Sequence, residues 1–104
     1  MIKKTTTLFI VFLGLITLRQ AYAVDRLQTG FPELPNDARR VAERSVMCIY
    51  FAGEQHGDGG ERDKEIWKRF KELRCSKVGH DLKVMRMKYK NNTKILSTLQ
   101  EADQ

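Results

Sequence analysis

Residues 36–53 read NDARRVAERSVMCIYFAG, and the order of these side chains decides the fold class of the chain. Small and apolar residues recur at steps of three and four positions, at Ala38, Val41, Ala42, Ser45, Cys48, Ile49 and Ala52. An α-helix turns by about 100° per residue, so this spacing places them on one face of a helix. Asn36 and Asp37 are good N-cap residues and Gly53 is a plausible C-cap, which together predict a helix over 37–52.

Further helical patterns follow toward the C-terminus. Apolar side chains at the same steps predict a second helix from residue 61 to about 75, with acidic residues at its start and basic residues at its end. A third helix is predicted over about 77–90 and a last one over 94–102, with Thr93 as its N-cap. The break at Asn91-Asn92 is short, so these last two segments are either two helices or one kinked helix.

No stretch alternates apolar and polar residues over a convincing length, so no strand is predicted. The expected fold is therefore all-α, a small bundle of three to four short helices with one disulfide once a signal peptide is removed. Ahead of the helical domain, 36–104, residues 24–35 hold a glycine and two prolines and show no period. We expect this segment to be an extended N-terminal arm that Phe31 and Leu34 attach to the core.

The first 23 residues have the three parts of a secretory signal peptide. Lys3 and Lys4 precede an apolar run over 8–18, and Ala21-Tyr22-Ala23 places small residues where a signal peptidase cuts. The apolar run is too short to span a bilayer, which takes about 20 residues, and an uncleaved anchor is the less favoured alternative. The short basic start is typical of bacteria, so we predict a periplasmic or secreted protein.

Removal of residues 1–23 changes the charge balance. The whole chain of 104 residues has 19 basic and 13 acidic side chains and a net charge of +6. The leader holds three bases and no acid, which leaves 81 residues with a net charge of +3. No nucleic-acid recognition motif is present, so nucleic acid is not an expected partner. No second apolar stretch is long enough to span a membrane, so no stable membrane insertion is expected after cleavage.

The two cysteines, Cys48 and Cys75, are predicted to form a disulfide because an isolated pair is normally oxidised outside the cytosol. Such a bond would stabilise a domain of this size by roughly 3–4 kcal/mol. There is no C-x-x-C motif, and the spacing of the cysteines and histidines fits no standard zinc finger. If the second helix is regular, Cys75 lies opposite Ile66. Either that helix ends at about Leu73, or Cys48 approaches it from the Trp67 side.

Residues 53–60, GEQHGDGG, are expected to form a flexible polar loop. Glu54, His56 and Asp58 bear groups that divalent metals accept as ligands, but their spacing matches no established metal motif, so no metal site and no cofactor are predicted. Glu54 and Glu61 could form an acid/base pair for cutting a glycosidic bond, but a glycine-rich loop is a poor support for that chemistry. We therefore expect no enzymatic activity.

Charge is unevenly distributed along the chain. Residues 62–90 hold 11 bases and 4 acids, whereas residues 24–61 hold 4 bases and 7 acids. The basic segment indicates either docking to an acidic partner or anionic surface, or simply two solvated helix faces. The loop and the second helix supply the candidate contact residues. They are Gly53, Glu54, His56, Asp58, Lys64, Lys68 and Lys71.

Small size, export, a disulfide and the lack of catalytic residues favour a non-enzymatic binding protein. The predicted function is that of a small periplasmic or secreted protein that binds another protein of the envelope, such as an inhibitor or immunity protein of a cell-wall hydrolase or secreted effector. Two alternatives remain open. The first is a ligand- or metal-binding envelope protein, and the second is a structural or stress-related envelope protein without catalytic activity.

The chain also resembles a group of small exported proteobacterial proteins without assigned activity. The resemblance rests on Cys48-Ile49-Tyr50-Phe51-Ala52-Gly53-Glu54, on Glu72-Leu73-Arg74-Cys75, on Tyr89-Lys90-Asn91-Asn92 and on residues 95–99. It covers about residues 45–102 and is most specific in the two cysteines and in Gly53-Glu54. It implies a periplasmic, helical, disulfide-bonded domain and no reaction. The loop after Gly53 is richer in glycine than the pattern of that group.

Overall fold

The computed structural model describes residues 25–104, and the predicted signal peptide over 1–23 lies outside the described residues. Within the described part the protein is a small all-α fold with one disulfide and without strands, as the sequence predicts. Its helices are α2 (Asn36–Glu54), α3 (Glu61–Leu73), α4 (Cys75–Lys88) and α5 (Thr93–Ala102).

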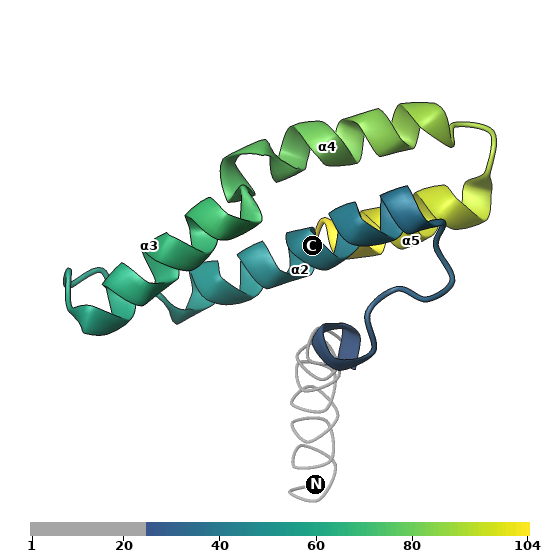
Figure 1. The fold of residues 1–104 in the computed structure, drawn as a ribbon. Coiled ribbons are helices and arrows are strands. Elements are labelled where there is room, and N and C mark those ends of the chain that lie inside the picture. Colours follow the sequence, from purple (N-terminus) through teal and green to yellow (C-terminus); the bar gives the residue numbers. More distant parts are fainter. Residues whose placement is uncertain (1–24) are drawn as a thin grey trace, which may run out of the picture.

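Helix α2 is the long central element, and the other three helices pack on it (Figure 1). Helices α3 and α4 follow one another along one side of α2, with α3 beside its C-terminal half and α4 beside its N-terminal half (Figure 1). Helix α5 lies against the N-terminal half of α2 and also contacts α4. The molecule therefore has two parts, a three-helix part and a projecting α2–α3 hairpin.

The apolar core lies in the three-helix part. It is formed by side chains of the N-terminal segment, the first half of α2, α4 and α5, namely Phe31, Leu34, Ala38, Val41, Ala42, Leu82, Leu99 and Ala102. Phe31 and Leu34 are buried, which confirms that they attach the N-terminal segment to the core.

The N-terminal segment differs from the extended arm that we expected over 24–35. Residues 25–29 form a helical turn, which Arg26 stabilises through contacts that the local sequence does not reveal. Its guanidinium binds both carboxylate oxygens of Glu101 in α5, at 3.1 and 2.9 Å, and donates to the Gly30 carbonyl. The chain then turns at Gly30, whose φ of +67° favours glycine. A Cβ there would also lie 2.7 Å from the Oε1 atom of Glu43.

Helix α2 is longer than the predicted 37–52. Gly53 continues the helix and does not cap it, because the chain leaves α2 only at Gln55, which is extended. At the other end, Pro35 occupies the N-cap position and no side chain caps the helix. The Asp37 carboxylate instead accepts hydrogen bonds from the Ala38 N–H, from Lys88 and, at 2.8 Å, from the Tyr89 hydroxyl. This residue thus ties the start of α2 to the end of α4.

The end of α3 settles the position of Cys75. Helix α3 ends at Leu73 because Arg74 adopts the left-handed conformation, with φ 55° and ψ 48°, and Cys75 then begins α4. The first of the two sequence alternatives for Cys75 is therefore correct. Similarly, α4 and α5 are two separate helices, and Asn92 is the N-cap of α5 where Thr93 was expected, because its side chain accepts a hydrogen bond from the Ile95 N–H at 3.1 Å.

Candidate interaction surface

The disulfide fixes the base of the α2–α3 hairpin. Cys48 in α2 and Cys75 at the start of α4 are bonded, with their Cα atoms 5.7 Å apart, as predicted. The bond lies next to the break at Arg74, so it holds the junction of α3 and α4 against α2. Neither sulfur is free to act as a nucleophile or metal ligand.

Arg44 reinforces the same junction. Its guanidinium donates to the carbonyl oxygens of Leu73 and Arg74, at 2.9 and 3.1 Å, and binds the Asp81 carboxylate at 2.8 Å. The carbonyls at the end of a helix have no partner within it, so a cation placed there stabilises that end. The hydrogen bond from Arg44 also lowers the pKa of Asp81.

The loop at the far end of the hairpin is organised by Asp63. This carboxylate belongs to the first turn of α3, is only 5% exposed, and accepts hydrogen bonds from the backbone N–H groups of His56, at 2.9 Å, and Gly59, at 3.2 Å. The hydrogen bond from the His56 N–H is the main cause of the lowered pKa of Asp63. The loop is thus attached to α3, where we expected a flexible connector.

Asp63 was not among the candidate residues of the sequence, although one signal was present. An acidic residue at the third position of a helix often reaches back to N–H groups ahead of that helix. The glycines before Glu61 make such a turn possible, and Gly57 and Gly59 indeed have positive φ values.

The predicted loop residues lie near one another along the chain, but their side chains do not converge on a common site. Gly53 is exposed in the last turn of α2, and the Glu54 carboxylate lies 3.9 Å from Arg62 of α3. The Asp58 carboxylate accepts a hydrogen bond from the Gly60 N–H at 2.9 Å, and His56 is exposed. Over residues 25–104, no group of three or more His, Cys, Asp or Glu side chains could hold a metal ion.

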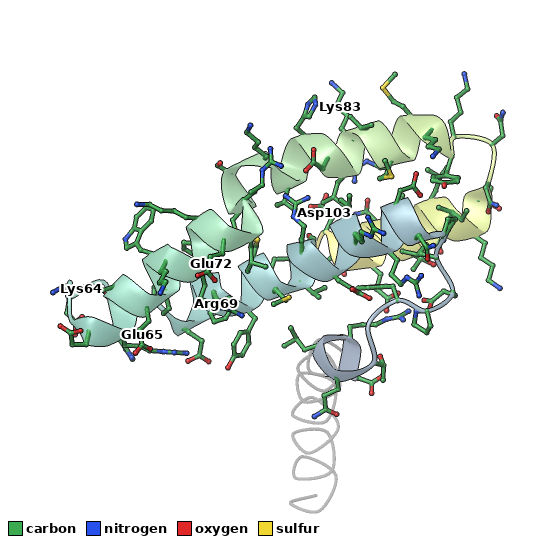
Figure 2. All side chains as sticks on the ribbon, in the orientation of Figure 1. Lys64, Glu65, Arg69, Glu72, Lys83 and Asp103 are labelled. Atoms are coloured by element: carbon green, nitrogen blue, oxygen red, sulfur yellow. A yellow bond between two sulfur atoms is a disulfide. The ribbon has the colours of Figure 1, made fainter. Side chains whose placement is uncertain are left out.

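The three predicted lysines share one face of α3. Lys64, Lys68 and Lys71 are rotated by about 140° to 200° from the buried Ile66, on the side of the helix away from α2. Lys64 pairs with Glu61 at 3.4 Å, while Glu72 pairs with Arg69 and Glu65 with Arg62 (Figure 2). Lys68 and Lys71 have no acidic partner within the described part of the chain.

Trp67 is an exposed residue of this surface that the sequence did not identify. It is 59% exposed, and its ring packs edge-on against Phe70, with a centroid distance of 5.9 Å. Sequence periodicity placed it beside the apolar stripe of α3. Among residues 25–104 no further helix covers that edge of the α2–α3 hairpin, so the indole remains accessible between the lysine face and Phe70.

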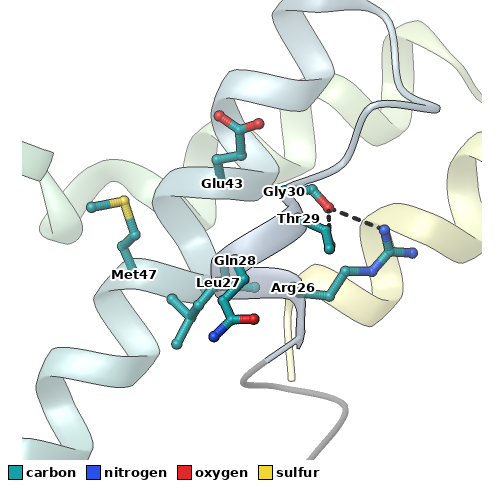
Figure 3. Close-up of a pocket in the computed structure, with 8 residues that line it drawn as sticks. Arg26, Leu27, Gln28, Thr29, Gly30, Glu43 and Met47 are labelled. Atoms are coloured by element: carbon teal, nitrogen blue, oxygen red, sulfur yellow. Dashed lines mark hydrogen bonds between the residues drawn. The ribbon is translucent and has the colours of Figure 1, made fainter.

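A separate small pocket lies between the N-terminal turn and α2 (Figure 3). Its volume of about 260 Å³ is below the range of about 300–1,000 Å³ that small-molecule sites usually have. The Arg26 guanidinium and the Thr29 hydroxyl beside it are both directed at the Gly30 carbonyl oxygen (Figure 3). These polar groups are therefore engaged in the fold. The lining residues are Arg26, Leu27, Gln28, Thr29, Gly30, Glu43, Val46 and Met47.

No family model, curated protein or solved structure matches this chain. The resemblance to small exported proteobacterial proteins therefore stays a prediction. None of the helices in residues 25–104 has the length and apolar character needed to cross a bilayer.

Proposed function

We propose that this protein is a small, non-enzymatic binding protein of the bacterial periplasm or exterior that docks to another protein through the end of its α2–α3 hairpin. An inhibitor or immunity protein of a cell-wall hydrolase or secreted effector is the role that we favour. The disulfide supports a location outside the cytosol, since such bonds persist in oxidising compartments.

The observation that carries this proposal is the loop held by Asp63. An exposed loop whose backbone is already fixed loses little conformational entropy when a partner binds, and this favours affinity. Glu54, His56 and Asp58 are then presented from a defined backbone at the free end of the hairpin. Lys64 lies in the first turns of α3, next to this loop, and Lys68 and Lys71 extend the polar surface along the helix.

The pKa shifts of three carboxyl groups suit structural anions better than general acids. Asp37, Asp63 and Asp81 all have lowered pKa values, because the ionised groups accept hydrogen bonds from Lys88, the His56 backbone and Arg44, respectively. A general acid in hydrolysis needs the opposite change, a raised pKa that keeps its proton near neutral pH. The oxidised cysteines provide no thiolate for covalent catalysis.

The proposal is tested by affinity capture with three forms of the mature protein. The wild type is expected to capture one envelope protein in stoichiometric amount from an extract of the native cell. Replacement of Glu54→Ala with His56→Ala should abolish this capture without loss of helical circular dichroism. A control, Arg40→Ala with Lys94→Ala, changes two exposed residues distant from the loop and should leave capture unchanged.

Two results would contradict the proposal. One is the absence of any stoichiometric partner, and the other is equal capture by the loop variant and the wild type. A zymogram with purified peptidoglycan tests the non-enzymatic part independently, because clearing by the wild-type protein would mean that it hydrolyses the cell wall itself.

A further inference from the structure

Helices α3 and α4 carry an excess of basic side chains, which is clearest when the ion pairs of these helices are considered one by one. Every acidic side chain between residues 61 and 88 already has a partner. Asp63 accepts backbone N–H groups, and the other four pair with basic residues, as Glu61–Lys64, Glu65–Arg62, Glu72–Arg69 and Asp81–Arg44. Four of the five carboxylates of these two helices are therefore paired with a cation within the fold, and the fifth, Asp63, is buried against the loop.

The same stretch and the turn that follows it retain six exposed cations without an acidic partner in the described residues. These are Lys68, Lys71, Arg74, Lys77, Lys83 and Lys90. Neighbouring positive charges without counter-charges repel one another, and an anionic partner relieves that repulsion.

These cations face mainly away from the body of the molecule. Lys68 and Lys71 lie opposite the buried Ile66 of α3, and Lys77 is rotated by about 140° from the buried Leu82 of α4. Lys83 points away from α2 and α5 (Figure 2). Helices α3 and α4 follow one another along the same side of α2 (Figure 1), and we name these six cations together the outer basic face.

Three apolar side chains are exposed on or beside the outer basic face. Trp67 of α3 is 59% exposed, Val84 of α4 is 43% exposed and Met87 of α4 is 66% exposed. Val84 and Met87 are rotated by about 140° to 200° from Leu82, among the lysines, and Trp67 lies at the edge of the lysine face of α3. They are distributed along both helices and do not form one compact patch.

We propose that the outer basic face binds peripherally to a membrane surface rich in anionic phospholipid, with Trp67 and Met87 entering the headgroup region. Lipid headgroups rearrange to meet cations dispersed over two helices, whereas a protein partner would need fixed acids at matching positions. Protein hot spots also require clustered, well-packed anchors, which separate apolar side chains do not provide. Tryptophan and lysine side chains suit an interface because each has an apolar body and a polar end.

This inference goes beyond the proposed function and does not depend on it, because it uses neither the 53–61 loop nor a protein partner. The two surfaces share only Lys68 and Lys71 of α3, whereas the other four cations of the outer basic face lie outside the proposed docking surface. The interaction is peripheral, consistent with helices α2 to α5 being unable to span a bilayer. The binding orientation leaves the loop at the end of the hairpin, where it can still meet a protein.

The test uses the mature protein and two kinds of vesicle, one of phosphatidylcholine alone and one with equal parts of phosphatidylcholine and phosphatidylglycerol. At low ionic strength the protein should sediment with the anionic vesicles only. Trp67 is the only tryptophan of the chain, so its fluorescence should shift to the blue on binding. Added salt should release the protein, because the Debye length falls from about 30 Å at 0.01 M to about 3 Å at 1 M.

A pair of variants with equal net charge shows whether the outer basic face is responsible. In Lys77→Glu with Lys83→Glu, vesicle affinity should fall by at least about twentyfold, since one cation near an anionic surface contributes about fivefold. In Arg40→Glu with Lys94→Glu, the same charges are reversed elsewhere, and affinity should change by no more than about twofold. Lys77, Lys83, Arg40 and Lys94 are all exposed, so both variants should fold.

Two outcomes would overturn the inference. The first is an absence of wild-type binding to anionic vesicles at low salt, and the second is an equal loss of binding in the two variants. If the first outcome is accompanied by a protein partner that is lost in the Lys77/Lys83 variant, the outer basic face belongs to an acidic protein. If either variant fails to fold, the dependence of wild-type vesicle binding on salt and on lipid composition still decides the question.

Discussion

The two parts of the molecule are held together by different forces. The three-helix part has an apolar core that joins the N-terminal segment to α2, α4 and α5. The α2–α3 hairpin has a single fully buried large side chain, Ile66, and depends otherwise on the Cys48–Cys75 disulfide, the Arg44 contacts and the Asp63 loop. Apolar burial stabilises one part, and a covalent bond with a few polar contacts stabilises the other.

This difference means that the hairpin can unfold locally while the core stays folded, whereas loss of core packing should unfold the whole domain. A chain of this size has a total stability of roughly 5 kcal/mol, so a single core substitution removes a large share of it. The polar contacts of the hairpin contribute less each, and their loss should remain local.

The largest effect is expected from Leu99→Ala in the core. Leu99 is fully buried, and truncation of such a leucine costs about 2–5 kcal/mol through lost burial and the cavity left behind. Urea denaturation followed by circular dichroism should show the loss. Val84→Ala, at an exposed position of α4, is the control and should change the free energy of unfolding by less than about 0.5 kcal/mol. Equal midpoints for the two variants would refute the position of the core.

The next effect is that of Cys48→Ser with Cys75→Ser. The two cysteines are separated by 27 positions, and loss of a loop closure of this length should cost about 3–4 kcal/mol. Hydrogen exchange should show that amide protection falls in α3 before it falls in α5, because α3 has little apolar burial of its own. Uniform loss of protection across all helices would contradict the division into two parts.

A smaller and more local effect is expected from Asp63→Ala. The loop N–H groups of His56 and Gly59 lose their acceptor, and this should lower the free energy of unfolding by about 1–2 kcal/mol. The loss is no larger because water can accept part of these hydrogen bonds. Hydrogen exchange should increase in the loop and the first turn of α3 but not in α5. Asp58→Ala is the matched control, because the hydrogen bond that its side chain accepts from the Gly60 N–H is exposed. An equal effect in that variant would mean that Asp63 does not organise the loop.

The smallest effect is the loss of stability at low pH that follows from protonation of Asp37 in the three-helix part. Hydrogen bonds from Lys88 and Tyr89 lower the pKa of Asp37 from 3.8 to about 2. A lowered folded-state pKa adds stability that is fully present above the ordinary value of 3.8 and is lost as the pH falls toward about 2. Urea midpoints measured between about pH 5 and pH 2 should fall less steeply for Asp37→Asn than for the wild type. An identical pH dependence would show that this contact adds no stability.

The helices and the disulfide could be predicted from the sequence because their signals are local. Periodic apolar residues define α2 and α5, and two cysteines allow only one pairing within the chain. Their boundaries were less accurate, since Gly53 is also compatible with a helix interior and continues α2 as far as Glu54.

The features missed by the sequence depend on distant partners. The break at Arg74 is stabilised by Arg44, 30 positions earlier, and the turn at 25–29 depends on a bond from Arg26 to Glu101, 75 positions later. The fixed loop depends on one buried aspartate, which in the sequence is only one of several acids near a helix start. For the candidate surface, the lysines were predictable. The exposure of Trp67 was not, because it follows from the fact that no further helix of the described residues covers that edge of the hairpin.

The core also governs when this protein can fold. It joins Phe31 and Leu34, near the start of the described chain, to Leu99 and Ala102 in α5. The contact from Arg26 to Glu101 links the same two segments. A polypeptide that leaves the ribosome or a translocation channel N-terminus first cannot complete this core until its final turns have emerged. Truncation within α5 should therefore leave an unfolded product, and this core can form only after α5 has emerged.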